Sequence, residues 1–305
     1  MSITVAVLGP GGVGGLLAAA LDRAATPVTV VAQESTASVI ADAGLRVSSV
    51  RLGDFVAHPP ALACLEQPVD VLVVATKAIG LEGALERIAA APALVLPLLN
   101  GLDHLPLLRA RFGAETVVAG TIRVEADRPE AGVVVHTSPF LRVDMASRYA
   151  TAGARMQVLA QTLTDAGIPA RVGDSEPQVM WSKLVRLNAL ACTTSAFDKL
   201  LGEIRDTPEL RDQLIGAIDE GCAVALAEGA SIDSGDPLGE LNQAHATLGS
   251  SMQRDIAAGR TPELDAIPGA VLRAGARHGV DCPTIERLVA MIAARAGVPL
   301  PVAVG

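Results

Sequence analysis

A glycine-rich turn near the start of the sequence constrains the fold of this chain more than any other feature. Residues 9–14 read Gly-Pro-Gly-Gly-Val-Gly and fit the pattern GxGxxG. A β-branched run, Ile3–Leu8, precedes the turn; an Ala- and Leu-rich stretch, Gly12–Ala24, follows it and leads to a second strand-like run, Val28–Ala32. This order predicts a βαβ unit whose turn holds the pyrophosphate of a dinucleotide, although a glycine turn can also serve packing alone. The predicted cofactor-binding residues of the turn are Gly9, Gly11, Gly12, Val13 and Gly14.

The rest of the first half continues the alternation of strands and helices. Val69–Thr76 and Ala93–Leu99 are apolar on both faces, as buried strands of a parallel sheet are, and Leu81–Ala90 fits a crossover helix between them. Three runs of alternating polarity within residues 117–146 predict an antiparallel extension of the same sheet. The half closes with a predicted helix over Ala152–Ala166 and a short strand at Ala170–Val172. These elements predict an α/β Rossmann domain over residues 1–173.

The second half contains helical patterns only. Apolar residues recur at i, i+3 and i+4, and Pro or Gly separates one segment from the next. We therefore predict an all-α domain over residues 174–305 that follows the Rossmann domain. Its predicted helices are Glu176–Ala196, Pro208–Glu228, Pro237–Ala258, Pro262–His278 and Pro283–Ala296.

The composition argues against several classes of function. The aromatic residues are one Trp, one Tyr and four Phe, and 33 acidic residues outnumber 24 basic ones, so a nucleic-acid partner is not expected. No apolar stretch approaches the ~20 residues of a spanning helix and no export signal is seen, which predicts a cytoplasmic protein without a membrane partner. Four separated cysteines and five histidines without ligand spacing predict no metal site.

The end of the second predicted strand bears on the choice between NAD and NADP. An acidic residue at this place favours NAD, and a nearby Arg favours the 2′-phosphate of NADP. Glu34 lies 20 positions after Gly14, the spacing of the NAD acid, whereas the neighbouring Gln33 can accept a phosphate. Both can also be ordinary loop residues. The residues alone therefore leave the choice of cofactor open.

Lys183 is the candidate proton donor for a hydride-transfer reaction. Such a reaction needs a group that gives a proton to the carbonyl oxygen. Lys183 lies early in an otherwise apolar helix, two residues after the sole Trp, at the start of the second domain. A lysine there can face a cleft between the domains, where partial desolvation eases the loss of its proton. The alternative is a surface lysine whose stem covers apolar neighbours.

Five short blocks, spread in order over residues 9–265, give the chain a resemblance to the ketopantoate reductase (2-dehydropantoate 2-reductase) family. The resemblance implies a Rossmann domain, a helical second domain, and NADPH-dependent reduction of a 2-oxo acid to a 2-hydroxy acid. The specific reaction it implies is that of ketopantoate to pantoate in pantothenate biosynthesis. The blocks are Gly9–Gly14, Thr76-Lys77-Ala78, Asn100-Gly101, Trp181-Ser182-Lys183-Leu184, and Ser250-Ser251-Met252 with Thr261-Pro262-Glu263-Leu264-Asp265.

The resemblance also implies a role for each matching residue. Lys183 corresponds to the catalytic lysine of the family, and Glu263 to the glutamate that pairs with it and holds substrate. Ser251 corresponds to a serine that binds the substrate carboxylate, although it can equally cap a helix. Asn100 corresponds to an asparagine that contacts both cofactor and substrate, and Lys77 to a lysine near the nicotinamide. Simple turn or loop positions are the alternatives for Asn100 and Lys77.

The chain departs from the family pattern at two places. The family has Asn four residues after the catalytic lysine, but here Leu187 takes that position and Asn188 follows it. A step of five residues turns Asn188 about 140° away from Lys183 in a regular helix. A π-bulge between the two residues would correct this, so we predict such a bulge with Asn188 as a substrate-binding residue. The second departure is Gln33, which replaces the Arg that reads the 2′-phosphate.

Other functions remain as alternatives. The same chemistry can act on another 2-oxo acid, and a β-hydroxyacid or opine-type dehydrogenase also joins a Rossmann domain to a helical one. A non-catalytic dinucleotide sensor would keep the glycine turn and lose the chemistry. The predicted partner is a small 2-oxo acid. The sequence leaves the oligomeric state open, with a homodimer among the alternatives.

Overall fold

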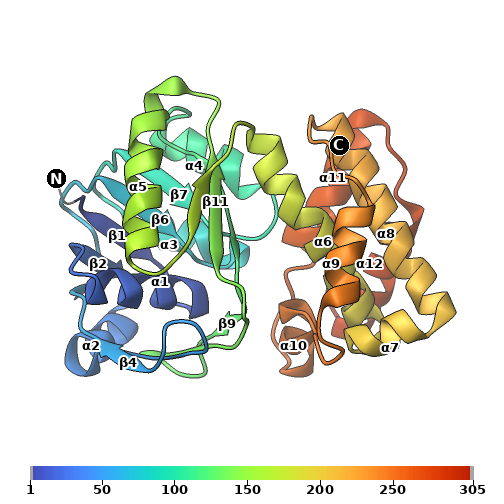
Figure 1. Cartoon of the computed structure of the whole chain (residues 1–305), viewed down its shortest axis with the longest axis horizontal. Coiled ribbons are helices and arrows are strands. Elements are labelled where there is room, and N and C mark those ends of the chain that lie inside the picture. The colour runs from blue at the N-terminus through green and yellow to red at the C-terminus, as the bar shows by residue number, and fades with distance from the viewer. Residues whose placement is uncertain (1–2, 303–305) are drawn as a thin grey trace. The chain divides into compact units, whose positions relative to one another are not determined.

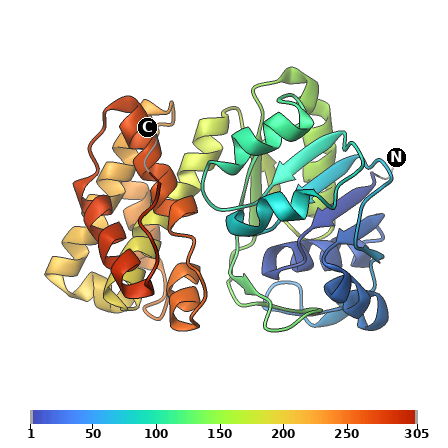
Figure 2. The same ribbon diagram turned by 180° about the vertical axis from the view of Figure 1, so that it is seen from behind.

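A computed structural model describes residues 3–302 of the chain, which form two compact units. The first unit holds the described residues up to 99 together with 104–179, and the second holds 100–103 and the described residues from 180 onward. The predicted domain boundary at residue 173 lies slightly before this division. Nothing in the sequence indicated that residues 100–103 would belong with the second unit. Figures 1 and 2 show the elements of both units from opposite sides.

Five parallel strands form the central sheet of the first unit, in the order β5-β2-β1-β6-β7. The first strand, β1, lies in the middle and pairs with β2 on one side and β6 on the other, so the winding of the chain reverses there. Every residue of β1, β6 and β7 is buried, as in strands covered on both faces. The predicted Rossmann arrangement is confirmed. The strands are β1 (Val5–Leu8), β2 (Val28–Val31), β5 (Ala61–Leu62), β6 (Val71–Val74) and β7 (Leu94–Pro97).

The remaining strands form two smaller sheets, which corrects the predicted single extension. Strand β8 pairs antiparallel with β11 in the sheet β12-β11-β8, whereas β10 and β9 join β3 and β4 in the sheet β4-β3-β10-β9. Alternating polarity shows that a strand has one buried face, but residues far away in the sequence decide which neighbour it pairs with. The strands are β3 (Leu45–Ser49), β4 (Phe55–Ala57), β8 (Ala119–Arg123), β9 (Ala126–Asp127), β10 (Val133–His136), β11 (Arg142–Ala146) and β12 (Ala170–Val172).

The helices of the first unit enclose a core built mainly of Ala, Val and Leu. The first helix, α1, is fully buried from Gly14 to Leu21, because small residues on most of its faces let it pack closely. The predicted crossover helix Leu81–Ala90 is shorter than expected and ends at Leu85. The helical elements are α1 (Gly12–Arg23), α2 (Glu34–Ala43), η1 (Ala78–Gly80), α3 (Leu81–Leu85), α4 (His104–Phe112), η2 (Ala150–Ala152) and α5 (Gly153–Asp165).

The second unit is helical throughout its described residues and has its own core around Trp181. The predicted helix Pro237–Ala258 is two helices separated by residues 244–250, and α7 was not predicted. The predicted helix Pro262–His278 begins instead with a π-helical turn, η3. Within residues 3–302, no helix is long and apolar enough to span a membrane. The elements are α6 (Glu176–Phe197), α7 (Leu201–Asp206), α8 (Pro208–Ala227), α9 (Gly235–Gln243), α10 (Ser251–Ala257), η3 (Asp265–Gly269), α11 (Ala270–His278) and α12 (Pro283–Ala296).

Candidate active site

The glycine turn between β1 and α1 has the geometry of a pyrophosphate cradle. Gly9 has a φ of +89°, which side chains rarely permit, and a Cβ on Gly14 would lie 2.2 Å from the carbonyl oxygen of Gly9. A Cβ on Gly12 would lie 2.3 Å from the carbonyl oxygen of Ala126. In contrast, a Cβ on Gly11 would meet no atom within 4 Å, so open space adjoins the backbone there. The first N–H groups of α1 have no partner within the helix, and no side chain caps it. These residues fit a dinucleotide phosphate.

The other predicted cofactor residues of the first unit follow adjacent strands of the central sheet. Val13 lies in the first turn of α1, beyond β1; Gln33 is exposed beyond β2 and precedes α2; and Lys77 is exposed beyond β6. Because these strands are parallel neighbours, their carboxyl ends share one edge of the sheet. The arrangement is that of a dinucleotide-binding edge.

Thr76 is a candidate cofactor contact to which the sequence analysis gave no role. Its Oγ1 atom is buried and has no hydrogen-bond partner among the described residues. Its methyl carbon would lie 2.8 Å from a Cβ on Gly9, which places Thr76 against the glycine turn. Buried hydroxyl groups are normally hydrogen-bonded, so an unpaired one beside a cradle suits a ligand atom.

Three polar side chains of the second unit form one hydrogen-bonded chain. The Nζ atom of Lys183 donates to Oδ1 of Asn100 at 2.8 Å, and Nδ2 of Asn100 donates to Oε2 of Glu263 at 3.1 Å. An ammonium group has donors only and a carboxylate has acceptors only, whereas an amide has both. Asn100 can therefore join the two charged groups in this one orientation. Each of the three residues is partly buried, so they are shielded from water without being closed to a ligand.

The local fold explains why Asn100 lies among helices of the second unit. The next residue, Gly101, has a φ of +85°, and a Cβ there would lie 1.8 Å from the carbonyl oxygen of Ala266 in η3. Leu102 packs against the core of the second unit. The short segment 100–103 is thus held by a backbone contact that only glycine permits and by burial of an apolar side chain.

Glu263 lies just before the π-helical turn η3, and Lys183 lies on α6. The backbone N–H of Gly269 donates to the carbonyl of Leu264, five residues earlier, and Pro268 within the turn has no N–H to donate. On α6, the buried Trp181 and Leu184 fix the helix in the core on either side of Lys183. The three candidate side chains therefore project from segments that are anchored by packing.

The predicted π-bulge in α6 is wrong, because α6 is α-helical from Glu176 to Phe197. The side chain of Asn188 is fully buried, and its Oδ1 accepts a hydrogen bond from Sγ of Cys192 at 3.4 Å. Its Nδ2 has no partner among the described residues. A regular helix turns Asn188 about 140° away from Lys183. Substrate binding by Asn188 stays a prediction, now without the bulge on which it depended.

Ser251 is not the cap of α10. That role belongs to Ser250, whose Oγ accepts from the backbone N–H of Gln253 at 3.0 Å. The hydroxyl of Ser250 also accepts a hydrogen bond from Thr194 at 2.9 Å. No bond of the Ser251 hydroxyl to another described residue is present. Ser251 is half-buried, so its hydroxyl suits the predicted contact with a substrate carboxylate.

Comparison with known proteins relates the chain to one family of reductases. Residues 5–146 match the family described as ketopantoate reductase PanE/ApbA, and residues 177–296 match the ketopantoate reductase PanE/ApbA C-terminal family. The chain is 28% identical to a 2-dehydropantoate 2-reductase of Halobacterium salinarum, over 94% of this chain and 97% of the relative. A solved structure of 2-dehydropantoate 2-reductase from Geobacter metallireducens has a TM-score of 0.88 at 27% identity and covers 95% of this chain and 99% of that one.

A second solved structure shares the fold. It is a D-mandelate dehydrogenase with NADH and anilino(oxo)acetate, with a TM-score of 0.86 at 21% identity, and it covers 97% of this chain and 99% of that one. Taken together, the two family matches span most of the sequence, and the fold agrees with them. The chain therefore belongs to the ketopantoate reductase family and is a dinucleotide-dependent oxidoreductase.

Proposed function

We propose that the chain reduces a 2-oxo acid to the corresponding 2-hydroxy acid, with 2-dehydropantoate as substrate and NADPH as cofactor. The observation that carries this proposal is the hydrogen-bonded chain Lys183–Asn100–Glu263. It presents an ammonium group, held by neighbours and partly shielded from water, that can give a proton to a carbonyl oxygen. Relatives over nearly the whole chain are named 2-dehydropantoate 2-reductase, which supports this substrate.

Lys183 acts as the proton donor in the proposed reaction. One of its three N–H donors is directed to Asn100, and another can meet the carbonyl oxygen of the substrate. Its positive charge stabilises the negative charge that develops on that oxygen. The N–H bond of Nζ then breaks as the O–H bond forms, and solvent returns a proton to Lys183. Glu263 accepts from Asn100, and so keeps the amide oriented with its oxygen toward Lys183.

The remaining contacts divide between substrate and cofactor. Ser251, whose hydroxyl makes no hydrogen bond to another residue within 3–302, would hold the substrate carboxylate. The glycine turn would hold the pyrophosphate, and Lys77 and Asn100 would contact the nicotinamide end. When bound, the cofactor supplies the hydride that forms the new C–H bond and leaves oxidised. Because Gln33 replaces an Arg that pairs with the 2′-phosphate, we expect turnover with NADH as well as NADPH.

The test is a comparison of wild type with Lys183→Ala in the oxidation of NADPH and NADH by 2-dehydropantoate. Loss of a general acid lowers kcat by about 10²- to 10⁴-fold, while the Kd of the cofactor changes little. The matched control is Lys199→Ala, because Lys199 is an exposed lysine of the same unit paired with Glu203. Lys199→Ala should retain wild-type kcat. Near-normal turnover by Lys183→Ala would overturn the assigned role.

A second candidate is the same reaction on a different 2-oxo acid. The D-mandelate dehydrogenase that shares this fold was solved with anilino(oxo)acetate, a different 2-oxo compound from 2-dehydropantoate. Measuring kcat/KM for a panel that includes phenylglyoxylate and branched aliphatic 2-oxo acids separates the two substrates. Cofactor binding without turnover on any member of the panel would instead favour a dinucleotide sensor.

A further inference from the structure

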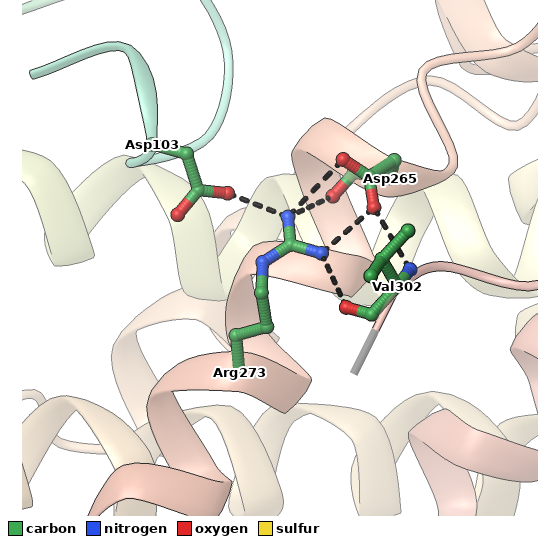
Figure 3. Close-up of polar contacts among 4 residues, drawn as sticks. All are labelled: Asp103, Asp265, Arg273 and Val302. Atoms are coloured by element: carbon green, nitrogen blue, oxygen red, sulfur yellow. Dashed lines mark hydrogen bonds and ion pairs between the residues drawn. The ribbon is translucent and has the colours of Figure 1, made fainter. Parts of the chain in front are cut away.

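A single arginine of the second unit joins three separate segments of chain. Arg273 lies on α11, and its side chain is only 11% exposed. Its Nη1 donates to Oδ1 of Asp265 at 2.7 Å and to the carbonyl of Val302 at 3.1 Å. Its Nη2 donates to Oδ2 of Asp103 at 2.5 Å and to the carbonyl of Asp265 at 2.8 Å. Figure 3 shows the guanidinium group lying between these partners.

The partners of Arg273 are close in sequence to two members of the hydrogen-bonded chain. Asp103 lies three residues after Asn100, in the short segment 100–103, and Asp265 lies two residues after Glu263. We call the hydrogen bonds of Arg273 to Asp103, Asp265 and Val302 the arginine bridge. The bridge links the two segments whose side chains meet in the Asn100–Glu263 hydrogen bond. Within residues 3–302, Arg273 makes no hydrogen bond to Lys183, Asn100 or Glu263 themselves.

The chemistry of the bridge requires an arginine. A guanidinium group offers five N–H donors in a fixed plane, whereas a lysine offers three on one nitrogen and cannot reach three segments in these directions. Burial disfavours the charge of Arg273, but hydrogen bonds with Asp265 and Asp103 outweigh it and raise the pKa above its ordinary value. The guanidinium group of Arg273 consequently keeps its positive charge at any pH at which the enzyme would be assayed.

We propose that Arg273 is a positioning residue that holds Asn100 within hydrogen-bond distance of Glu263, and through Asn100 sets the place of the Lys183 ammonium group. This inference rests on the proposed function, because it assigns Lys183 as the proton donor. The side chains of Asp103 and Asp265 are 48% and 63% exposed, so little else packs on them. Without the bridge, segment 100–103 keeps its backbone contact at Gly101 but loses the hydrogen bond that holds Asp103, its last residue.

The experiment compares Arg273→Met with Arg277→Met. Arg277 lies one turn further along α11 and pairs with Glu228 at 3.0 Å, so it is a matched surface ion pair away from the site. We expect kcat of Arg273→Met to fall at least tenfold while the Kd of NADPH changes much less, because the glycine turn that would hold the pyrophosphate belongs to the first unit. An ammonium group that loses an accepting oxygen gives up its proton more readily, so the alkaline limb of the kcat–pH profile should move to lower pH. Arg277→Met should change neither.

Hydrogen–deuterium exchange gives a readout that does not depend on activity. The amides of residues 100–103 should exchange faster in Arg273→Met than in wild type or Arg277→Met. Should Arg273→Met fail to fold, Asp103→Ala removes one exposed arm of the bridge and should show the same changes at smaller size. Wild-type kcat, pH profile and exchange in the folded variants would overturn the bridge. Normal turnover by Lys183→Ala would overturn the proposed function instead, and the exchange result would still decide the bridge.

Discussion

Asn100 joins a group that can only donate to a group that can only accept, and its replacement tests that property. In Asn100→Asp the shape is kept but the donor is lost, so a second carboxylate faces Glu263. We expect kcat to fall by roughly 10- to 100-fold, because the positioned amide is lost from the site. Two carboxylates near Lys183 also favour its charged form, so the alkaline limb of the pH profile should move to higher pH.

The control for this substitution is Asn242→Asp, at an exposed asparagine on α9 of the same unit. It adds the same negative charge away from the site and should leave the kcat–pH profile unchanged. An Asn100→Asp enzyme with the wild-type profile would show that the amide does not join Lys183 to Glu263 during turnover.

At the level of single residues, the sequence predicted which residues are candidates for the site, but it did not predict how they are arranged. Lys183 and Glu263 stand in short blocks with a recognisable order, so both were predicted as candidate site residues. The place of Asn100 between them was not, because it depends on contacts across 83 and 163 positions of sequence. Arg273 and Asp103 gave no signal, since isolated charged residues 170 positions apart resemble any solvated surface pair.

Among the elements, η3 and the segment 100–103 lie against each other, and we expect the conformation of each to depend on the other. Gly101 tests this dependence, because a Cβ there would lie 1.8 Å from the carbonyl oxygen of Ala266. We expect Gly101→Ala to move Asn100, lower kcat by more than tenfold, and reduce the free energy of unfolding by about 1–3 kcal/mol through strain at positive φ. Steady-state kinetics and denaturant unfolding measure the two effects separately.

Gly259→Ala is the matched control for this element. Gly259 also has a positive φ, +66°, and lies in the second unit, but a Cβ there would meet no atom within 4 Å. Both variants should lose stability, and Gly101→Ala alone should lose activity. If Gly259→Ala lost as much activity, general destabilisation would explain the result and the contact with Ala266 would not.

The elements also show why a π-helical turn was predicted in the wrong place. The prediction for α6 came from a single mismatch between a family pattern and the spacing of Lys183 and Asn188. The observed turn, η3, lies where Pro268 interrupts a helical pattern. A proline within a helix removes a backbone donor, so Pro268 was a physical signal for a distorted helix at that position.

For the whole molecule, we expect the free energy of unfolding to depend on pH through a buried histidine of the first unit. His136 on β10 is 1% exposed, and its Nδ1 and Nε2 lie 2.8 Å and 3.2 Å from the hydroxyls of Ser49 and Ser138. Ser138 donates to the carbonyl of Phe140, so it accepts from Nε2, and Nδ1 accepts from Ser49. This network uses a neutral ring. Burial lowers the pKa of His136 below its ordinary value; the Phe140 carbonyl opposes this.

A lowered pKa in the folded state makes stability fall with acid. Above about pH 6.5, the ordinary histidine value, the contribution is fully present, and it is lost as pH falls toward the folded pKa. We expect the free energy of unfolding to decrease by up to about 1.4 kcal/mol per pH unit in this range. Urea unfolding of His136→Gln, with the exposed His58→Gln as control, measures this slope. A slope in His136→Gln equal to that of wild type would assign the acid sensitivity to other groups.

At the scale of the whole molecule, the two fold classes were predicted better than the way in which strands and segments are shared among sheets and units. The order of apolar runs and helical patterns predicted a Rossmann domain and a helical domain, because buried parallel strands and amphipathic helices leave clear periodicities. The pairing of β10 with β3 and the place of segment 100–103 were not predicted. Both depend on contacts between distant residues, which periodicity does not encode.

Because segment 100–103 belongs to the second unit, the two halves of the molecule are not two consecutive lengths of the gene. A fragment beginning at residue 180 would contain Lys183 and Glu263 but lack the amide that joins them. A chimera of two related proteins joined near residue 180 would have the same defect, because its segment 100–103 would come from one parent and its η3 turn from the other. Because of residues 100–103, the second unit is complete only when both halves of the sequence are present in one chain.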